Sequence, residues 1–304
     1  MSARTVPSPP LQVPLPAAES ARIGIAPVAT MLGSGLANQT GAAIGSLAFP
    51  VVGPLGVVAV RQYVAAVVLL AIGRPRLRSF TRHQWWPVVL LALVFGTMNL
   101  SLYTAVDRIG LGLAVTLEFL GPLTIALAGS RRRVDVLYSL LAAAGVVILM
   151  RPRPSADYVG MSLGLLAAAC WAAYILLNRT VGKRVPGAQG AAAAAALSAV
   201  LFLPVGVVLA VREPLTAGAL GCAVAAGVLS SAVPYAADLF TLRHVPARAF
   251  GLFMSVNPVI AALVGLVGLG QELGLAEWCG ITAIVTANAL ALGVGGTRRG
   301  GVRA

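Results

Sequence analysis

Apolar stretches of bilayer-spanning length recur along the whole chain, and they constrain its fold more than any other feature. A helix that crosses a membrane needs about 20 mainly apolar residues. Ten such stretches occur, with short connections between them. They are 28–48, 54–73, 85–106, 110–129, 134–150, 159–178, 187–210, 217–240, 247–270 and 275–295. The pattern predicts an all-α membrane protein of ten transmembrane helices, which leaves no room for a soluble catalytic domain.

The composition excludes a soluble protein and several kinds of partner. Of the 304 residues, 59% are hydrophobic and 10% are charged, whereas soluble domains are about half apolar and a quarter charged. The net charge of +13 would suit a nucleic acid, but no basic stripe interleaves with aromatic residues, so we expect no nucleic-acid partner. The three cysteines are far apart, and no phosphate loop or metal-binding motif occurs, so we expect no metal and no cofactor.

The distribution of lysine and arginine predicts the orientation. If the ten stretches cross the membrane, 17 of the 22 basic residues lie on one side and four on the other, with Arg61 inside a stretch. Cytoplasmic loops carry such an excess. We therefore expect both termini in the cytoplasm. The Pro-rich residues 1–26 are predicted to be a disordered cytoplasmic tail, and residues 296–304 a second tail.

Two stretches resemble each other, which predicts an internal repeat. Residues 113–129 align with residues 249–265 at a constant offset, so that Pro122 falls on Pro258 and Gly129 on Gly265. Each copy is the fourth helix of a five-helix half, 27–150 or 159–295. Because five is odd, the second half enters the membrane upside down. An inverted 5+5 repeat is typical of transporters, whose substrate site lies near the midplane between the halves.

Three ionisable residues, Arg61, Glu118 and Asp238, lie within predicted spans. A charge at the bilayer centre costs at least about 2.5–3.5 kcal/mol, so such residues face a cavity or one another. Glu118 is in the middle of its stretch, four residues before Pro122. Burial favours the protonated form of a carboxyl, so Glu118 is a candidate proton-coupling and substrate-binding group. The alternative is a structural ion pair with Arg61.

The other two charges each allow several interpretations. Arg61 could bind a substrate carboxylate with two N–H groups, neutralise Glu118, or extend toward the membrane surface. Asp238 precedes Arg243 and Arg248 by a few turns. That neighbourhood slightly favours an interfacial ion pair over the alternative, a role in proton coupling.

Polar and aromatic side chains in the same stretches complete the candidate site. An amide within a membrane needs a partner, which is either another helix or a substrate. Hydrogen bonding between helices is the simpler interpretation for each residue alone. The candidate substrate-binding residues are Glu118, Arg61, Asn38, Gln39, Asn99, Tyr103, Trp171, Tyr174, Tyr235 and Asn257. The glycine spacings 41–45 and 160–164 indicate close helix packing and allow a homodimer.

Motifs in both halves resemble a known family. They include GVVAVR at 56–61, LAVTLEFLGP at 113–122, ACWAAYIL at 169–176, LSSAVPY at 229–235 and RAFGLFMSVNP at 248–258. The chain resembles the drug/metabolite transporter superfamily of EamA type, and within it the threonine/homoserine exporter branch. The resemblance implies export of small amino acids and related metabolites, driven by the proton gradient.

The resemblance also bears on single residues. Glu118 matches the family's fourth-helix glutamate, and Arg61 matches its second-helix arginine. Three positions depart from the pattern. Asp238 stands where the family has glutamate after Pro-Tyr, Asn257 stands where an acidic residue precedes the proline, and Ser46 replaces a lysine found in one member.

We therefore expect an exporter in the inner membrane of a bacterium that works by proton antiport with alternating access. Its expected partners are a small molecule, the proton and the lipid bilayer. One alternative is efflux of drugs or hydrophobic cations, which would need an acidic cavity in which Arg61 is hidden. A more remote alternative is a membrane-embedded enzyme acting on lipids. The acidic residues outside the stretches are scattered over separate loops, so we expect no enzyme.

Overall fold

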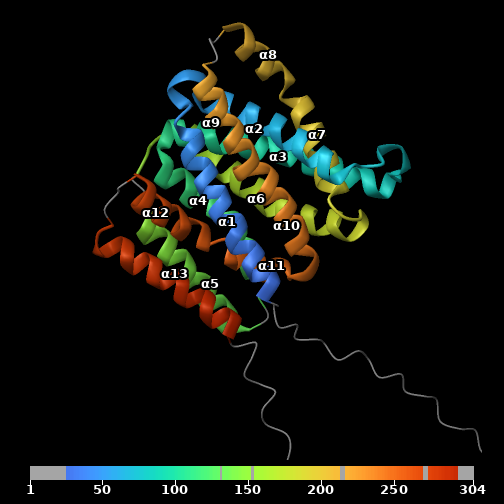
Figure 1. The fold of residues 1–304 in the computed structure, drawn as a ribbon. Coiled ribbons are helices and arrows are strands. Elements are labelled where there is room, and N and C mark those ends of the chain that lie inside the picture. The colour runs from blue at the N-terminus through green and yellow to red at the C-terminus, as the bar shows by residue number, and fades with distance from the viewer. Residues whose placement is uncertain (1–24, 131, 152–153, 213–215, 270–272, 294–304) are drawn as a thin grey trace, which may run out of the picture.

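The computed structural model describes residues 25–130, 132–151, 154–212, 216–269 and 273–293, and these residues are helical with no strand (Figure 1). The N-terminal tail prediction lies almost entirely, and the C-terminal one entirely, outside the described residues. The elements are α1 (Ile25–Ser46), α2 (Phe49–Gly73), η1 (Leu77–Ser79), α3 (Arg82–Ile109), α4 (Leu111–Ala128), α5 (Arg133–Met150), α6 (Tyr158–Arg184), α7 (Gln189–Leu201), α8 (Leu203–Arg212), α9 (Ala217–Gly227), η2 (Val228–Ala232), α10 (Val233–His244), α11 (Ala247–Phe253), α12 (Val256–Leu269) and α13 (Leu275–Gly293).

Each of the ten predicted stretches is mostly helical in the described residues, but several are interrupted. Stretch 187–210 divides into α7 and α8, and stretch 247–270 into α11 and α12. Stretch 217–240 contains a π-helical turn, η2, between α9 and α10. In α2, Gly53 has a φ of 67° directly before Pro54. Proline lacks the N–H that an α-helix needs, and prolines lie at or near these interruptions.

Length and composition identify five helices in the described residues that could cross a membrane. They are α2, α3, α5, α6 and the continuous helix Ala217–His244. The pair α7 and α8, bent by 49°, would make a sixth span if it counts as one. Shorter apolar helices occupy Leu113–Ala128, Ala249–Val264 and Leu275–Ala291. The protein therefore has several membrane-spanning helices, and the predicted total of ten remains an expectation.

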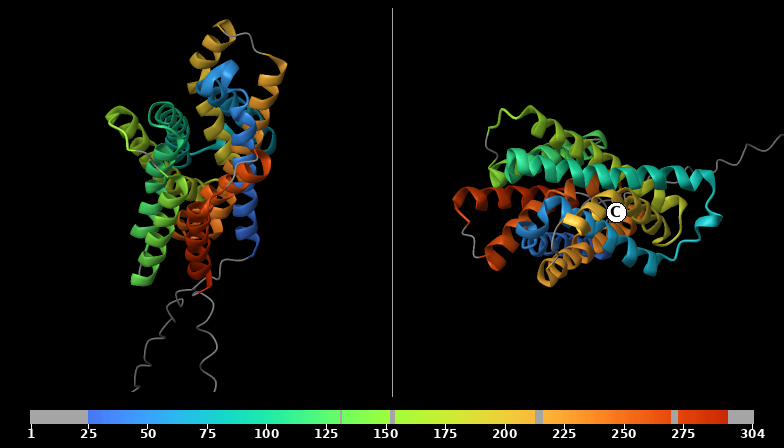
Figure 2. Two further views of the ribbon diagram at one scale, coloured as in Figure 1. Left: turned by 90° about the vertical axis from the view of Figure 1, so that its left-hand side faces the viewer. Right: turned by 90° about the horizontal axis from the view of Figure 1, so that it is seen from above.

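Helices from the two predicted halves pack against each other throughout the molecule. Helix α5 packs on α13, α2 on α7 and α4 on α11. Helix α3 packs on α6 and α7, and α1 packs on α9, η2, α10 and α12 (Figures 1 and 2). The α5–α13 pair crosses at two glycines: a Cβ added to either Gly145 or Gly280 would lie 2.8 Å from the carbonyl oxygen of the other. The two halves therefore form one interlocked bundle.

The glycine pairs with GxxxG spacing are used within the chain. A Cβ at Gly41 or Gly45 would touch the side chains of Ser230 or Ala226. Gly160 and Gly164 make corresponding close approaches to Ile109 and Leu117. These spacings thus explain internal helix packing, and the predicted homodimer remains an expectation without support from them.

One end of the bundle, which we call the closed end, is densely packed. It comprises the connections α2–α3, α6–α7 and α10–α11. Buried side chains there include Leu69, Leu91 and Leu242. The Arg243 guanidinium donates hydrogen bonds of 2.6–2.7 Å to the carbonyl oxygens of Gly182, Val185 and Gly187. Side chains and backbone together therefore tie the helices at this end.

The opposite end, the open end, holds the two ion pairs of the described residues. Arg108 pairs with Asp157 at 3.0 Å, and Arg151 pairs with Glu277 at 2.9 Å. Backbone hydrogen bonding, chiefly from Gly160, holds the pKa of Asp157 below its usual range, and Arg108 contributes in the same direction. The first and last described residues, by contrast, both lie toward the closed end (Figure 1).

Candidate functional site

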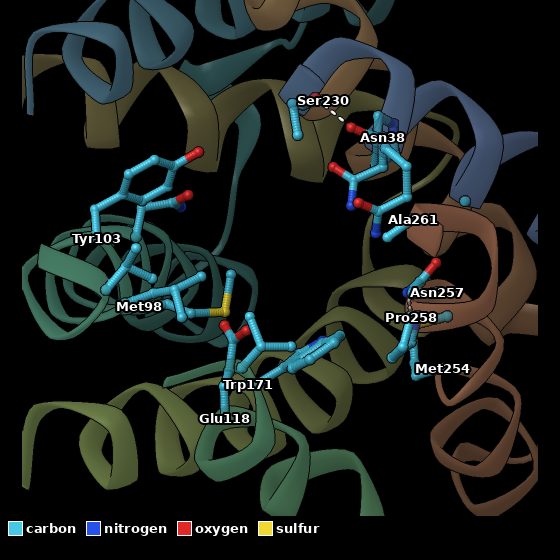
Figure 3. A pocket seen from close by; sticks show the side chains of 18 of the residues that line it. Asn38, Met98, Tyr103, Glu118, Trp171, Ser230, Met254, Asn257, Pro258 and Ala261 are labelled. Atoms are coloured by element: carbon cyan, nitrogen blue, oxygen red, sulfur yellow. Dashed lines mark hydrogen bonds between the residues drawn. The ribbon is translucent and has the colours of Figure 1, made fainter. Parts of the chain in front are cut away.

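A cavity of about 750 Å³ lies within the bundle, and helices of both halves line it (Figure 3). Its wall reaches the open end at Phe49, Asp107 and Met150, which lie at or near the ends of α2, α3 and α5. In the other direction the lining stops at Asp238, within α10. The cavity therefore reaches the open end and is separated from the closed end by packed side chains.

All eleven residues that the sequence selected line this one cavity, although they come from seven elements far apart in the chain. Whether any of them binds a substrate or a proton stays a prediction. They are Asn38, Gln39, Arg61, Asn99, Tyr103, Glu118, Trp171, Tyr174, Tyr235, Asp238 and Asn257.

Arg61 is 7% exposed and is held by three neutral oxygen atoms. Its Nη1 donates to the Tyr103 hydroxyl at 2.6 Å, its Nη2 to the Ser230 carbonyl at 2.8 Å, and its Nε to the Ser231 hydroxyl at 3.2 Å. A guanidinium has five N–H donors, so one N–H on each terminal nitrogen remains. The side chain neither pairs with Glu118 nor extends to the membrane surface, so the structure contradicts both of those interpretations.

The π-helical turn η2 supplies two of these three oxygen atoms, and its sequence explains why. In an α-helix the N–H of residue 234 would donate to the carbonyl of residue 230. Pro234 has no N–H, so the Ser230 carbonyl is free to accept from Arg61. The Ser230 hydroxyl in turn donates to the Asn38 carbonyl at 2.6 Å, which fixes the turn against α1.

Glu118 is also 7% exposed, but its surroundings differ. Its carboxyl points into the cavity near Met98 and Trp171 (Figure 3). Neither an ion pair nor a hydrogen bond to its carboxyl occurs within the described part of the chain. The alternative interpretation, a structural ion pair with Arg61, is therefore wrong, because Arg61 is held by hydroxyl and carbonyl oxygens instead.

Asp238 lies at the deep end of the cavity and accepts a hydrogen bond of 2.6 Å from the Tyr174 hydroxyl. Ser34 of α1 lines the same cavity. The expected ion pair with Arg243 is not formed, because five residues along a helix place the two side chains on different faces. Arg243 binds backbone carbonyls at the closed end instead. The side chain of Arg248 lies outside the described residues.

Three aromatic rings, those of Phe95, Tyr174 and Tyr235, pack together beside Asp238, and we call them the aromatic layer. The rings of Phe95 and Tyr235 are stacked, with centroids 4.2 Å apart and planes within 6° of parallel. The ring of Tyr174 packs against both at a tilt. Asn99 donates to the Phe95 carbonyl at 2.8 Å and to the Tyr235 hydroxyl at 3.4 Å, so its amide also joins two helices.

The sequence of this chain is similar to those of known transporters. The model of the EamA-like transporter family matches residues 158–293. The threonine/homoserine exporter RhtA of Salmonella typhimurium is 34% identical over 265 residues, which cover 86% of this chain and 90% of that protein. The Escherichia coli protein of the same name is 33% identical over the same length.

The chain belongs to the EamA-like transporter family. It is therefore a multi-pass membrane transporter, and the predictions of this family and of a transporter rather than an enzyme are confirmed.

More distant matches agree with this assignment. The uncharacterized transporter YwfM of Bacillus subtilis is 26% identical over 230 residues, 72% of this chain and 77% of that protein. A crystal structure superimposes with a TM-score of 0.74 over 89% of this chain and 98% of its own, at 20% identity. At that identity the likeness concerns the fold alone.

Several residues in or beside the cavity of this EamA-like transporter were not predicted from the sequence. Ser230 and Ser231 accept hydrogen bonds from Arg61, Ser34 lines the cavity, and Phe95 belongs to the aromatic layer. Serine is common in helices and usually bonds its own helix, so it gives little signal alone. Pro234, four residues after Ser230, was the available signal for a freed carbonyl.

Proposed function

We propose that this transporter exports small amino acids of the threonine and homoserine type across the inner membrane of a bacterium, in exchange for protons. The observation that carries the proposal is the presence of two groups in one cavity: an arginine with unused N–H donors and a carboxyl that has no hydrogen bond or ion pair among the described residues. An amino acid carries the two complementary charges. The names of the RhtA relatives agree with this substrate class.

In this proposal the substrate lies between Arg61 and Glu118. The two remaining N–H groups of Arg61 bind the α-carboxylate, and the ionised Glu118 binds the ammonium group. Amides and hydroxyls of the cavity wall are available to the substrate's own hydroxyl group. Trp171, Tyr174 and Tyr235 contribute apolar surface. The polar candidates for that contact are Asn38, Gln39, Asn99, Tyr103 and Asn257.

We propose that the fold is an inverted repeat of five plus five spans, 27–150 and 159–295, with both termini in the cytoplasm. The packing supports this, because exchanging the halves maps the helix contacts onto one another. The α3–α6 contact corresponds to that of α1 with α9, η2 and α10, and the α4–α6 contact corresponds to α1–α12. The self-corresponding pair α5–α13 crosses at Gly145 and Gly280, one from each half.

The direction of the chain at that crossing supports inversion. Gly145, near the end of α5, lies against Gly280, near the start of α13, and Tyr138 at the start of α5 clusters with Ala287 toward the end of α13. The two helices are therefore antiparallel, as equivalent helices of inverted halves must be.

The position of the cavity supports alternating access. With the closed end at the cytoplasm, the cavity reaches outward at Phe49, Asp107 and Met150. The packed closed end and the aromatic layer then form the inner barrier. This arrangement corresponds to an outward-facing state, from which substrate leaves and protons enter.

Proton coupling is assigned to Glu118 and, at the inner barrier, to Asp238. A proton on Glu118 removes the charge that holds the substrate ammonium group, so protonation from outside releases the amino acid. Asp238 bonds Tyr174 of α6 from its position on α10. A change in its charge would act on the contact between those helices.

Efflux of hydrophobic cations is the rival function, and the position of Arg61 disfavours it. A permanent positive charge on the cavity wall repels a cationic drug. Proteoliposomes loaded with unlabelled threonine and exposed to labelled threonine distinguish the two functions by counterflow. We expect threonine and homoserine to exchange, and a lipophilic cation dye to be neither taken up nor competitive. Dye transport without amino-acid exchange would overturn the proposal.

A further inference from the structure

The three partners of Arg61 define its orientation but leave its charge uncompensated. Tyr103 of α3 and both serines of η2 offer only hydroxyl or carbonyl oxygens. A buried charge is stabilised when an opposite charge pairs with it. The guanidinium is thus held in one orientation but has no negative charge beside it. An anion-binding site needs both properties before its ligand binds.

The groups that hold Arg61 are themselves fixed. Ser230 is 3% exposed and Ser231 is 1% exposed. The Ser230 hydroxyl is bonded to α1. A Cβ at Gly41 would clash with the Ser230 hydroxyl oxygen, so α1 and η2 approach too closely for any residue larger than glycine. The ring of Tyr103 packs edge-on against Phe49, with centroids 6.1 Å apart. The guanidinium therefore has three immobile acceptors and little freedom to rotate.

We propose that Ser231 and Tyr103, together with the π-helical turn at Ser230, are positioning residues that make the cavity specific for a carboxylate. They act through Arg61 by presenting one N–H of each terminal nitrogen as a fixed pair. A carboxylate accepts both and supplies the missing charge. The corresponding amide or methyl ester supplies no charge. The inference rests on the proposed function, since it concerns the same cavity.

Equilibrium binding tests this inference separately from transport. Titration calorimetry on the purified full-length protein would compare threonine with threoninamide and threonine methyl ester. We expect the wild type to bind threonine at least about tenfold more tightly than either analogue, because hydrogen bonds between charged groups exceed neutral ones. Ser231→Ala and Tyr103→Phe should weaken threonine binding about three- to tenfold and leave binding of the analogues unchanged.

Matched variants separate positioning from general damage. Ser139→Ala removes a buried hydroxyl that bonds its own helix in α5, outside the cavity. Tyr63→Phe removes a hydroxyl that bonds the Phe202 carbonyl. Both should keep the wild-type preference for threonine. Ser231→Thr, which retains a hydroxyl, should restore most of the preference lost in Ser231→Ala.

Two results would overturn the inference: a wild type that binds the amide as well as the acid, or cavity variants that weaken both ligands equally. Selective threonine binding without export would contradict the proposed function and leave the inference standing. Threonine export by a protein whose binding shows no preference for the carboxylate would contradict the inference and leave the proposed function standing.

Discussion

Arg61 and Glu118 face the same cavity and are equally buried, at 7% exposure each, yet their surroundings are opposite. Arg61 has three hydrogen-bond acceptors from two other elements. Glu118 has neither a hydrogen bond nor an ion pair to its carboxyl within the described residues. The difference separates two tasks. A fixed guanidinium keeps one charge in one place, whereas a carboxyl without protein partners can change its charge without breaking any bond.

The surroundings of Arg61 and Glu118 differ because the neighbouring helices present polar groups to Arg61 and mostly apolar side chains to Glu118. Pro234 frees a carbonyl next to Arg61, and the serines before it add a hydroxyl. Around Glu118 the cavity wall includes Met98, Val115 and Phe119, which have no polar group to donate, and the nearby Trp171 makes no hydrogen bond to the carboxyl within the described residues. In the proposed mechanism the charge of Glu118 therefore responds to protons and substrate.

Removing the charge of Glu118 should have the largest effect. We expect Glu118→Gln to lower threonine flux driven by a pH gradient by about 100-fold or more, because the side chain can no longer gain or lose a proton. Initial rates in proteoliposomes measure this. Glu277→Gln is the matched control, since Glu277 pairs with Arg151 outside the cavity. Wild-type flux in Glu118→Gln would remove this residue from the coupling mechanism.

Replacing Arg61 by lysine should have the next largest effect. Lysine keeps the charge but cannot hold three acceptors and a carboxylate at once. Losing a hydrogen bond to a charged group costs about 1.5–3 kcal/mol, so KM for threonine should rise about 10- to 100-fold with a smaller change in kcat. Saturation kinetics of export provide the test. An unchanged KM would show that the fixed guanidinium is not the carboxylate site.

Breaking the hydrogen bond between Tyr174 and Asp238 should have an intermediate effect on the rate of export. Tyr174→Phe keeps the ring of the aromatic layer and removes only the hydroxyl that bonds Asp238, so we expect export to slow about three- to tenfold. Asp238→Asn keeps an acceptor oxygen and removes the charge, so it should lose more of the response to a pH gradient. Tyr138→Phe in α5, outside the cavity, is the control. Equal, undiminished rates in both variants would exclude a role for this link.

The smallest effect is expected at Asp157, on the open end. The pKa of Asp157 is lowered because its ionised carboxylate is better stabilised in the folded than in the unfolded protein. This stabilisation is fully present above about pH 4, the ordinary aspartate pKa. It is lost as the pH falls through the lowered folded-state pKa. Asp157→Asn keeps the cap on α6 and removes the charge opposite Arg108. Thermal unfolding in detergent should show Tm lowered by no more than about 2 °C at pH 7, with a difference from the wild type that shrinks as the pH falls below about 4. A large loss of Tm that does not shrink as the pH falls would mean that the cap itself had failed.

The sequence predicted the helical segments and cavity residues because polar groups inside apolar stretches stand out. Arg61, Glu118 and Asn99 could only be tolerated where a cavity or partner exists. Partners were harder to predict. The short distance along the sequence favoured an ion pair between Asp238 and Arg243, but on the helix these two side chains point in different directions. The Tyr174 hydroxyl, from another helix, donates a hydrogen bond to Asp238 instead. The serines around Arg61 looked like ordinary helix residues, and only tertiary packing reveals their role.

In the proposed exchange, substrate leaves as protons enter through the same cavity. Simultaneous recording of threonine efflux and internal pH in proteoliposomes containing the wild-type protein tests it most directly. We predict that adding external acid accelerates threonine efflux and that protons enter in fixed proportion to the threonine released, with both fluxes lost together in Glu118→Gln. Threonine efflux at full rate without any proton entry would contradict the claim.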